Sequence, residues 1–153
     1  ERNVVITKNT ISACYEALGR YDDALRLDRE VYASAVRLFG PTSAQTLGLA
    51  LGLVQSLIKT EHYAEARTFI RERMQESRGL GDEHPVNMKL RHGLARAISR
   101  DGDITSRETL EETERILADL LCTTRRVLGP AYPDVVEQEE ELKRVRDWIR
   151  DCY

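Results

Sequence analysis

One predicted helix in the second half of the chain carries three cations and a histidine on a single face. They follow one another at spacings of three, four and four residues, which places them on successive turns: Lys89, His92, Arg96 and Arg100. Arginine can hold a carboxylate through two parallel hydrogen bonds, so the pattern indicates a surface for an acidic peptide or another carboxylate. The alternative is a solvated face, balanced by acids on neighbouring helices such as the one predicted over residues 134–151.

Residues suited to catalysis or to metal binding are few and dispersed. The chain has three histidines and three cysteines, and none of them stands in a Cys-His, CxxC or HExxH pattern. No serine occupies a strand-turn-helix elbow, and the glycines do not form a phosphate-binding loop. The cysteines, Cys14, Cys122 and Cys152, are predicted to be small apolar fillers. We therefore predict a protein that is not an enzyme and that uses no cofactor or metal.

The composition predicts one folded domain over residues 1–153. Of the 153 residues, 41% are hydrophobic and 32% are charged, which is typical of a folded domain and not of a disordered chain. The net charge of −3 argues against a nucleic-acid partner, and no run of 18 apolar residues predicts a membrane span. An odd number of widely spaced cysteines favours a reducing, cytoplasmic setting. Because the chain begins at Glu1, we expect a fragment of a longer protein.

Three similar turns divide the chain. They read "LFGPTSAQT", "LGDEHPVNM" and "LGPAYPDVV", and their first glycines, Gly40, Gly81 and Gly129, are 41 and 48 residues apart. Glycine commonly ends a helix because it adopts the left-handed conformation freely. Proline is tolerated in the first helical turn, so Pro85 and Pro133 are predicted to open the next helices. A period above 40 residues in a helical sequence predicts stacked helical hairpins.

A second landmark supports the period. "LGRYDDAL" and "TEHYAEAR" place Tyr21 and Tyr63 at equivalent positions 42 residues apart, and the third unit differs by an insertion at Ile104 to Thr109. The apolar residues recur with helical spacing and not with strand alternation. We predict helices over residues 4–18, 22–39, 43–59, 62–79, 86–100, 108–128 and 134–151. The first six form repeat units over about 4–40, 43–81 and 86–129, and the helix over 134–151 caps the array.

These units resemble tetratricopeptide repeats, in particular the 42-residue type of kinesin light chains. The resemblance rests on "ISACYEALGRYDDA", on "LVQSLIKTEHYAEA" with its "LGDEHP" ending, and on "LARAISRDGD". It implies an all-α, right-handed superhelix of three helical hairpins plus a C-terminal capping helix. The sequence departs from the family pattern at Val54, where a small residue is expected, and at Arg73 and Thr113, where small or apolar residues are usual.

The resemblance also implies a binding groove lined by the first helix of each unit. Counted from the apolar landmarks, the candidate groove residues are Asn9, Leu51, Gln55, Lys59, Lys89, His92, Arg96 and Arg100. Gly48 and Gly52 would leave room in this groove for a ligand. We therefore predict a protein-protein interaction module in an adaptor or scaffold, binding an acidic peptide segment with an apolar anchor. The alternative is a structural spacer, or a self-association unit acting through the C-terminal helix; the oligomeric state stays open.

Overall fold

The computed structural model describes residues 1–103 and 106–153, and within these ranges the chain is helical without strands. Seven α-helices follow one another, with a short 3-10 turn after the fourth. This confirms the predicted all-α class, and the helices agree with the predicted ranges to within a turn. Their bounds are α1 Arg2–Ala17, α2 Tyr21–Phe39, α3 Ala44–Lys59, α4 Tyr63–Glu76, α5 Pro85–Ser99, α6 Arg107–Val127 and α7 Pro133–Cys152.

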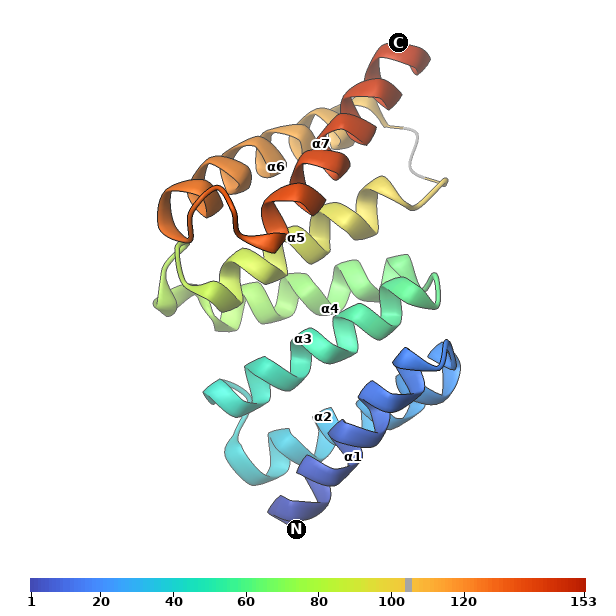
Figure 1. Cartoon of the computed structure of the whole chain (residues 1–153), viewed down its shortest axis with the longest axis vertical. Coiled ribbons are helices and arrows are strands. Elements are labelled where there is room, and N and C mark those ends of the chain that lie inside the picture. The colour runs from blue at the N-terminus through green and yellow to red at the C-terminus, as the bar shows by residue number, and fades with distance from the viewer. Residues whose placement is uncertain (104–105) are drawn as a thin grey trace.

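The helices form antiparallel pairs that stack from the N-terminus to the C-terminus along the long axis (Figure 1). The pairs α1–α2, α3–α4 and α5–α6 are followed by α7, which packs on both α6 and α5. We call the face formed by α1, α3, α5 and α7 the groove face. None of the helices in residues 1–103 and 106–153 is long and apolar enough to cross a membrane.

The three glycine turns have the positive φ that the sequence predicts, although α4 ends at Glu76 and a 3-10 turn over Arg78–Leu80 separates it from Gly81. Gly40, Gly81 and Gly129 have φ angles of 83°, 84° and 94°, a conformation that residues with a side chain rarely adopt. Pro85 and Pro133 are the first residues of α5 and α7. The middle turn is also held by Asn87, whose amide donates hydrogen bonds to the carbonyls of Ser77 at 3.0 Å and Gly81 at 2.7 Å.

Two apolar clusters hold the array together, and α1 takes part in neither. The larger cluster joins α2, α3, α4 and α5, and the smaller one joins α5, α6 and α7. From α1, Val5 and Ser12 are buried, and the Ser12 hydroxyl donates to the Ala24 carbonyl at 3.2 Å. Its direct contact with α3 is slight among the described residues and includes a hydrogen bond of 3.0 Å from the Ser56 hydroxyl to Glu16. The first helix is therefore attached mainly through α2.

Val54, the bulky departure from the repeat pattern, is accommodated by a glycine on the next unit. A Cβ atom added to Gly93 would lie 3.0 Å from Val54 Cγ1, which is tighter than ordinary packing. The absence of a side chain at Gly93 thus lets α5 approach α3. The bulk of Val54 is thus accommodated between two repeat units, at the contact of α3 with α5.

The other two departures are satisfied locally. The Arg73 guanidinium lies 4.8 Å from the centre of the Phe69 ring and donates a hydrogen bond to the Tyr32 hydroxyl. The Thr113 hydroxyl is buried and donates to the carbonyl of Thr109, one turn earlier, at 2.7 Å. Arg73 is therefore partnered across the boundary between α4 and α2, and Thr113 within its own helix.

Two expectations need correction or restriction. The cysteines were predicted to be apolar fillers, but Cys14, Cys122 and Cys152 are all exposed. Their side chains are open to solvent, so they do not fill the apolar core. The predicted insertion at Ile104 to Thr109 overlaps α6, which begins at Arg107, and its residues Ile104 and Thr105 lie outside the described residues.

Candidate functional site

The groove face contains two hollows that meet at Gly52. The N-terminal hollow lies between α1 and α3, has a volume of about 720 Å³, and includes Asn9 among its lining residues. The C-terminal hollow has a volume of about 320 Å³ and lies between α3, α5 and α7. Because Gly52 lines both, the two hollows adjoin each other along α3.

The N-terminal hollow is mostly apolar, and Arg2 is its one charged residue within the described ranges. Arg2 lies over the Phe39 ring, with 5.3 Å between the guanidinium carbon and the ring centre. Ile6 is 60% exposed although it lines the hollow. Gly48 and Gly52 leave the backbone of α3 uncovered there, since an added Cβ at either position would meet nothing within 4 Å. This hollow can accept an apolar side chain.

The C-terminal hollow combines charges of both signs. Lys89 and Arg96 enter from α5, and Asp134 and Glu137 enter from α7. Gln55 of α3 accepts a hydrogen bond of 3.1 Å from Nη1 of Arg96. The basic face predicted on α5 is therefore partly balanced by acids on α7, as the solvated-face alternative required.

Arg100 and Lys59, two further predicted groove residues, line neither hollow in the part of the chain that the structure describes. Arg100 donates to Oε1 of buried Glu141 through Nη2 at 2.7 Å and Nε at 3.1 Å. The other Glu141 oxygen accepts from the Ser99 hydroxyl at 2.6 Å. The ammonium of Lys59 lies 5.0 Å from the centre of the Tyr21 ring. Both cations thus have partners within the protein.

The carboxylate of Glu141 keeps its charge despite its burial. Burial alone would raise the pKa of Glu141, but the hydrogen bonds from Ser99 and Arg100, with the charges of Arg100 and Arg144, lower that pKa below its usual value. A buried carboxylate is tolerated when it is paired and hydrogen-bonded. This group therefore ties α7 to the end of α5.

His92 is the most buried of the predicted site residues. It is 6% exposed, lines the C-terminal hollow, and its Nε2 has no hydrogen-bond partner among the described residues. Burial, and then the positive charge of Arg96, lower the pKa of His92 below its usual value. The carboxylates on α7 oppose this shift without cancelling it: Glu137, Asp134 and Glu141.

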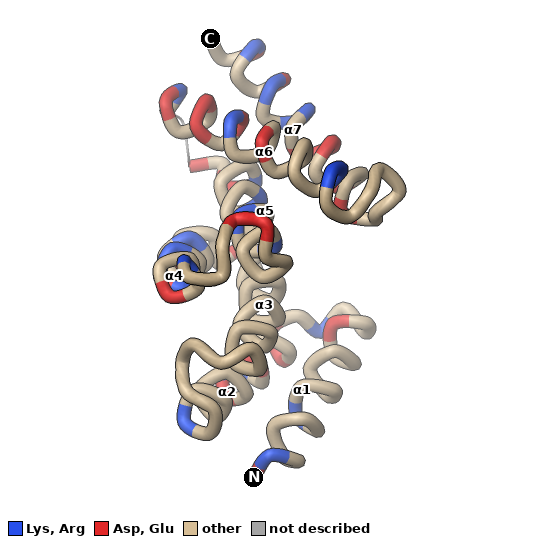
Figure 2. The backbone as a smooth tube through the Cα atoms, turned by 90° about the vertical axis from the view of Figure 1, so that its left-hand side faces the viewer, with Lys and Arg blue, Asp and Glu red and all other residues tan. Residues whose placement is uncertain are grey.

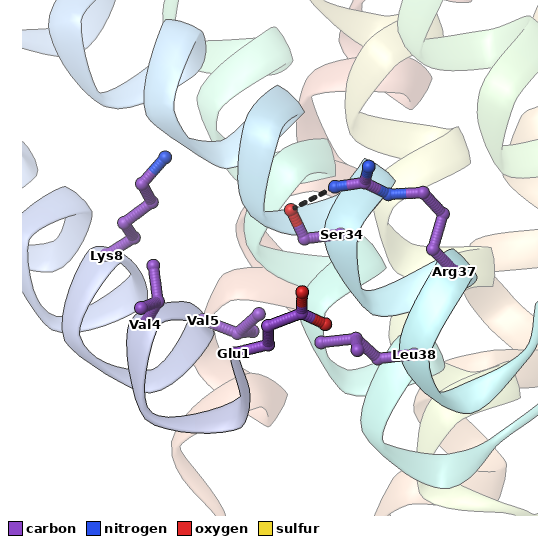
Figure 3. Close-up of a pocket in the computed structure, with 7 residues that line it drawn as sticks. All are labelled: Glu1, Val4, Val5, Lys8, Ser34, Arg37 and Leu38. Carbon is purple, nitrogen blue, oxygen red and sulfur yellow. Dashed lines mark hydrogen bonds between the residues drawn. The ribbon is translucent and has the colours of Figure 1, made fainter.

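A third hollow, of about 400 Å³, lies between α1 and α2 at the N-terminal end (Figure 3). Lys8 at its edge pairs with Glu30 at 2.6 Å, and Arg37 donates to the Ser34 hydroxyl at 3.3 Å. It includes none of the predicted groove residues. We therefore centre the candidate site on the two hollows of the groove face.

Comparison with known proteins agrees with this architecture. Residues 5–45 match the model of the tetratricopeptide repeat family. A crystal structure of a Podosopora anserina protein assigned as a kinesin light chain, with nearly identical TPR-like repeats, superposes with a TM-score of 0.81. The alignment covers 99% of this chain and 69% of that one, at 18% identity. The chain has the tetratricopeptide-repeat fold. A variant of the same Podosopora anserina repeats gives a TM-score of 0.79 at 18% identity, covering 97% and 69%.

The search of curated proteins gave no match. The matched residues 5–45 cover the first helical hairpin and the start of α3. At 18% identity the structural likeness defines the fold of the tetratricopeptide-repeat array and leaves its ligand to be inferred from the groove itself.

The acids of α7 are the groove residues that sequence reasoning missed. Asp134, Glu137 and Glu141 follow spacings of three and four residues, the same helical-face spacing as the cations of α5. The sequence therefore held the signal: acids of this helix were expected as one way to balance the cations of α5, but the individual residues were not predicted to line the groove. In the structure α7 lies where the first helix of a fourth repeat unit would lie, and it lines the C-terminal hollow together with α3 and α5.

Proposed function

We propose that this tetratricopeptide-repeat array is a non-enzymatic, cytoplasmic interaction module that binds a segment of another protein along its groove face. The observation that carries the proposal is that the two hollows adjoin at Gly52 on the same side of α3. Together they offer an uncovered stretch of α3 flanked by α1 on one side and by α5 and α7 on the other. A linear segment of a partner protein, extended or as a short helix, fits such a surface.

The N-terminal hollow is proposed to take the apolar anchor of the bound segment. Ile6 and Leu49 line it, and the bare backbone at Gly48 leaves depth for a large side chain. Burying an exposed aliphatic side chain such as Ile6 gains about 25 cal/mol for each Å² of apolar surface removed from water. An apolar anchor in this hollow therefore supplies the affinity.

The acidic preference is proposed to come from Arg2, Lys89 and Arg96. Arg2 lies in the N-terminal hollow, and the other two lie in the C-terminal hollow. The negative charges of Asp134 and Glu137 offset the positive charges of Lys89 and Arg96. Charge therefore selects the register of the bound segment more than it adds affinity. Arg100 is left out of this proposal because Glu141 occupies its guanidinium.

A displayed library of random 12-residue peptides tests the proposal. Peptides selected on the wild-type protein are titrated against Ile6→Asp and against the matched control Val136→Asp. The two aliphatic residues are 60% and 58% exposed, each near the start of its helix, but only Ile6 lines the groove. We expect at least tenfold weaker binding to Ile6→Asp and unchanged binding to Val136→Asp. Equal binding to both variants, or selection of basic peptides alone, would overturn the proposal.

Self-association through α7 is a second candidate function, and the exposure of Val136 favours it. The opposite face of α7 is engaged inside the array, where Val135, Leu142 and Val145 are buried. Light scattering of wild-type and Val136→Asp proteins separates the two functions. A dimer that becomes a monomer in the variant would support self-association, and a monomer in both would exclude this form of it.

A further inference from the structure

A hollow outside the groove face gathers three arginines. It has a volume of about 310 Å³ and is lined by residues of α4, of the 3-10 turn that follows α4, and of α5. Arg71 comes from α4, Arg78 from the turn and Arg91 from α5. The hollow shares no lining residue with the two hollows of the groove face. The proposed groove therefore does not account for it.

Arg71 and Arg78 differ from every other arginine of the chain. Each of the others has a hydrogen bond, an ion pair or an aromatic ring contact within the protein. The guanidinium groups of Arg71 and Arg78 have no such partner among residues 1–103 and 106–153, and both residues are exposed. The two arginines without a partner thus line one and the same hollow.

The backbone around the hollow holds both arginines in position. Arg71 and Arg78 are seven residues apart, about two helical turns or roughly 10 Å along the axis, and so project from one side of α4 and its turn. Ser77, next to Arg78, is buried, and its carbonyl accepts a hydrogen bond of 3.0 Å from the Asn87 amide of α5. Buried Leu94 lines the hollow on the α5 side. A ligand lying between the two arginines is within reach of both long side chains.

The donors in this hollow suit a phosphate group better than a carboxylate. Each guanidinium offers a fork of parallel N–H donors. A carboxylate has two oxygens, so one fork occupies it fully. A phosphate monoester has three terminal oxygens and close to two negative charges at neutral pH, so two forks can bind different edges of it. Arginine is also better suited than lysine to this planar, two-point contact.

The remaining charges of the hollow limit its affinity. Arg91 is paired with Asp119 of α6 at 2.5 Å, so its charge is already offset. Asp82 lines the hollow and has no ion-pair partner within the described ranges. Its carboxylate repels an anion that the two arginines attract. Asp82 therefore makes the site weaker than two arginines alone would be, and its removal should strengthen binding.

We propose that Arg71 and Arg78 form a second binding site, which takes a phosphate group and lies outside the groove. The phosphate is carried by a phosphorylated side chain of another protein or is free in solution. Binding is reversible, and the guanidinium groups donate hydrogen bonds to the phosphate oxygens. The site is independent of the proposed groove, because the two use different residues.

NMR titration of the ¹⁵N-labelled 153-residue chain tests the site. The probes are N-acetyl-O-phosphoserine-N-methylamide, inorganic phosphate and N-acetyl-glutamate-N-methylamide, at matched ionic strength. We expect the phosphoserine probe to bind at least about fivefold more tightly than the glutamate probe. Tighter binding of phosphoserine than of inorganic phosphate would support the site and assign it to phosphorylated side chains. Equal binding of these two would support the site and assign it to free phosphate. Glutamate binding as tight as phosphoserine binding would overturn the proposal.

Matched double variants separate the site from net charge. Arg71→Gln/Arg78→Gln should weaken the phosphoserine probe about tenfold or more and leave the thermal midpoint unchanged, since no partner within the described residues is lost. The control Arg37→Gln/Arg115→Gln removes the same charge at two exposed arginines outside the hollow and should bind like wild type. Equal weakening by the two double variants would overturn the proposal.

A single acid gives the opposite test, a gain of binding. Asp82→Asn should tighten the phosphoserine probe about threefold, because the repulsion inside the hollow is removed. The control Asp22→Asn removes the same charge at an exposed position of α2 outside the hollow. Equal effects of the two substitutions would contradict the placement of the phosphate between Arg71 and Arg78. Peptides that still distinguish Ile6→Asp from Val136→Asp would then leave the groove proposal intact.

Discussion

The two hollows of the groove are built in different ways. Around the N-terminal hollow, α1 and α3 stand apart and touch little among the described residues, and glycines on α3 face open space. Around the C-terminal hollow, α5 packs against both α3 and α7, and Val54 from α3 occupies the space next to Gly93 on α5. Figure 2 shows α1 set apart from the stacked α3 and α5, and the charged positions along α5, α6 and α7.

The difference separates adaptability from selectivity. A hollow whose walls make little contact can widen or narrow at small cost, which suits an apolar anchor of variable size. A hollow whose walls are packed and ion-paired holds its polar groups in fixed positions, which suits recognition of a particular charged group. The tetratricopeptide-repeat array thus has one end suited to anchoring and another suited to discrimination.

The largest effect on the packed C-terminal hollow is expected from removal of Glu141, which fixes α7 against α5. Glu141→Ala leaves Arg100 and the Ser99 hydroxyl without their acceptor. We expect a loss of about 2 kcal/mol in the free energy of unfolding, less than for a fully buried pair because Arg100 is partly exposed. Urea unfolding measures it, with Glu139→Ala at the exposed pair with Arg125 as the control, expected to change stability by less than about 0.5 kcal/mol.

The same pair predicts a pH dependence. The pKa of Glu141 is lowered in the folded protein, so its contribution is present above the unfolded value and is lost as the pH falls through the folded value. The difference in stability between wild type and Glu141→Ala should therefore shrink on acidification. A difference that grows toward low pH would contradict the role given to this carboxylate.

A substitution at Gly93 should likewise disturb the helix packing around the C-terminal hollow and leave the N-terminal hollow unchanged. A Gly→Ala change inside a helix ordinarily stabilises by about 1 kcal/mol, but here the added Cβ would lie 3.0 Å from Val54 Cγ1. Overpacking costs about 1–3 kcal/mol, so we expect Gly93→Ala to lower the free energy of unfolding by about 1 kcal/mol. In the double variant Val54→Ala/Gly93→Ala, the clash should disappear and the two changes should be non-additive. A Gly93→Ala protein more stable than wild type would show that α5 can shift freely.

The contrast between the halves also explains what the sequence could predict. The helices and their turns follow from local rules, such as the positive φ at Gly81 and the first-turn proline at Pro85, and these were predicted nearly to the residue. Helical spacing placed Lys89 and Arg96 on one face, the family resemblance predicted that this face lines a groove, and both residues line the C-terminal hollow. Local rules could not show that Val54 and Gly93 compensate each other, because that contact joins different repeat units.

Acids on the helix over 134–151 could be expected to balance the cations, but which acid pairs with which cation could not, for a related reason. Spacing on α5 placed Arg100 on the same face as Arg96, but only the packing of α7 brings Glu141 to it. The burial of His92 likewise depends on three helices meeting. Charge patterns on one helix therefore predicted which residues share a face, and the tertiary packing determined which of them remain available to a ligand.

A substitution at Gly52, at the junction of the hollows, should change stability and peptide affinity in opposite directions. Nothing lies within 4 Å of an added Cβ, so Gly52→Ala should stabilise the protein by up to about 1 kcal/mol through helix propensity. The same methyl group narrows the path between the hollows and should weaken selected peptides several-fold. Thermal unfolding and peptide titration measure the two effects, with Gly48→Ala, which lines the N-terminal hollow alone, as the comparison. Unweakened binding by Gly52→Ala would mean that no ligand crosses the junction.

The smallest expected effect is at Lys89, the exposed cation of the discriminating end. Lys89→Gln should leave the unfolding free energy unchanged, since no partner within the protein is lost among the described ion pairs. It should weaken an acidic peptide two- to threefold at low salt, with the difference vanishing as salt is raised, because exposed charges act through a screened field. Titrations at two salt concentrations measure this, and Lys143→Gln, an exposed lysine on α7 outside both hollows, is the control. Equal weakening by both variants would assign the effect to net charge. It would contradict the proposal that the C-terminal hollow selects an acidic group.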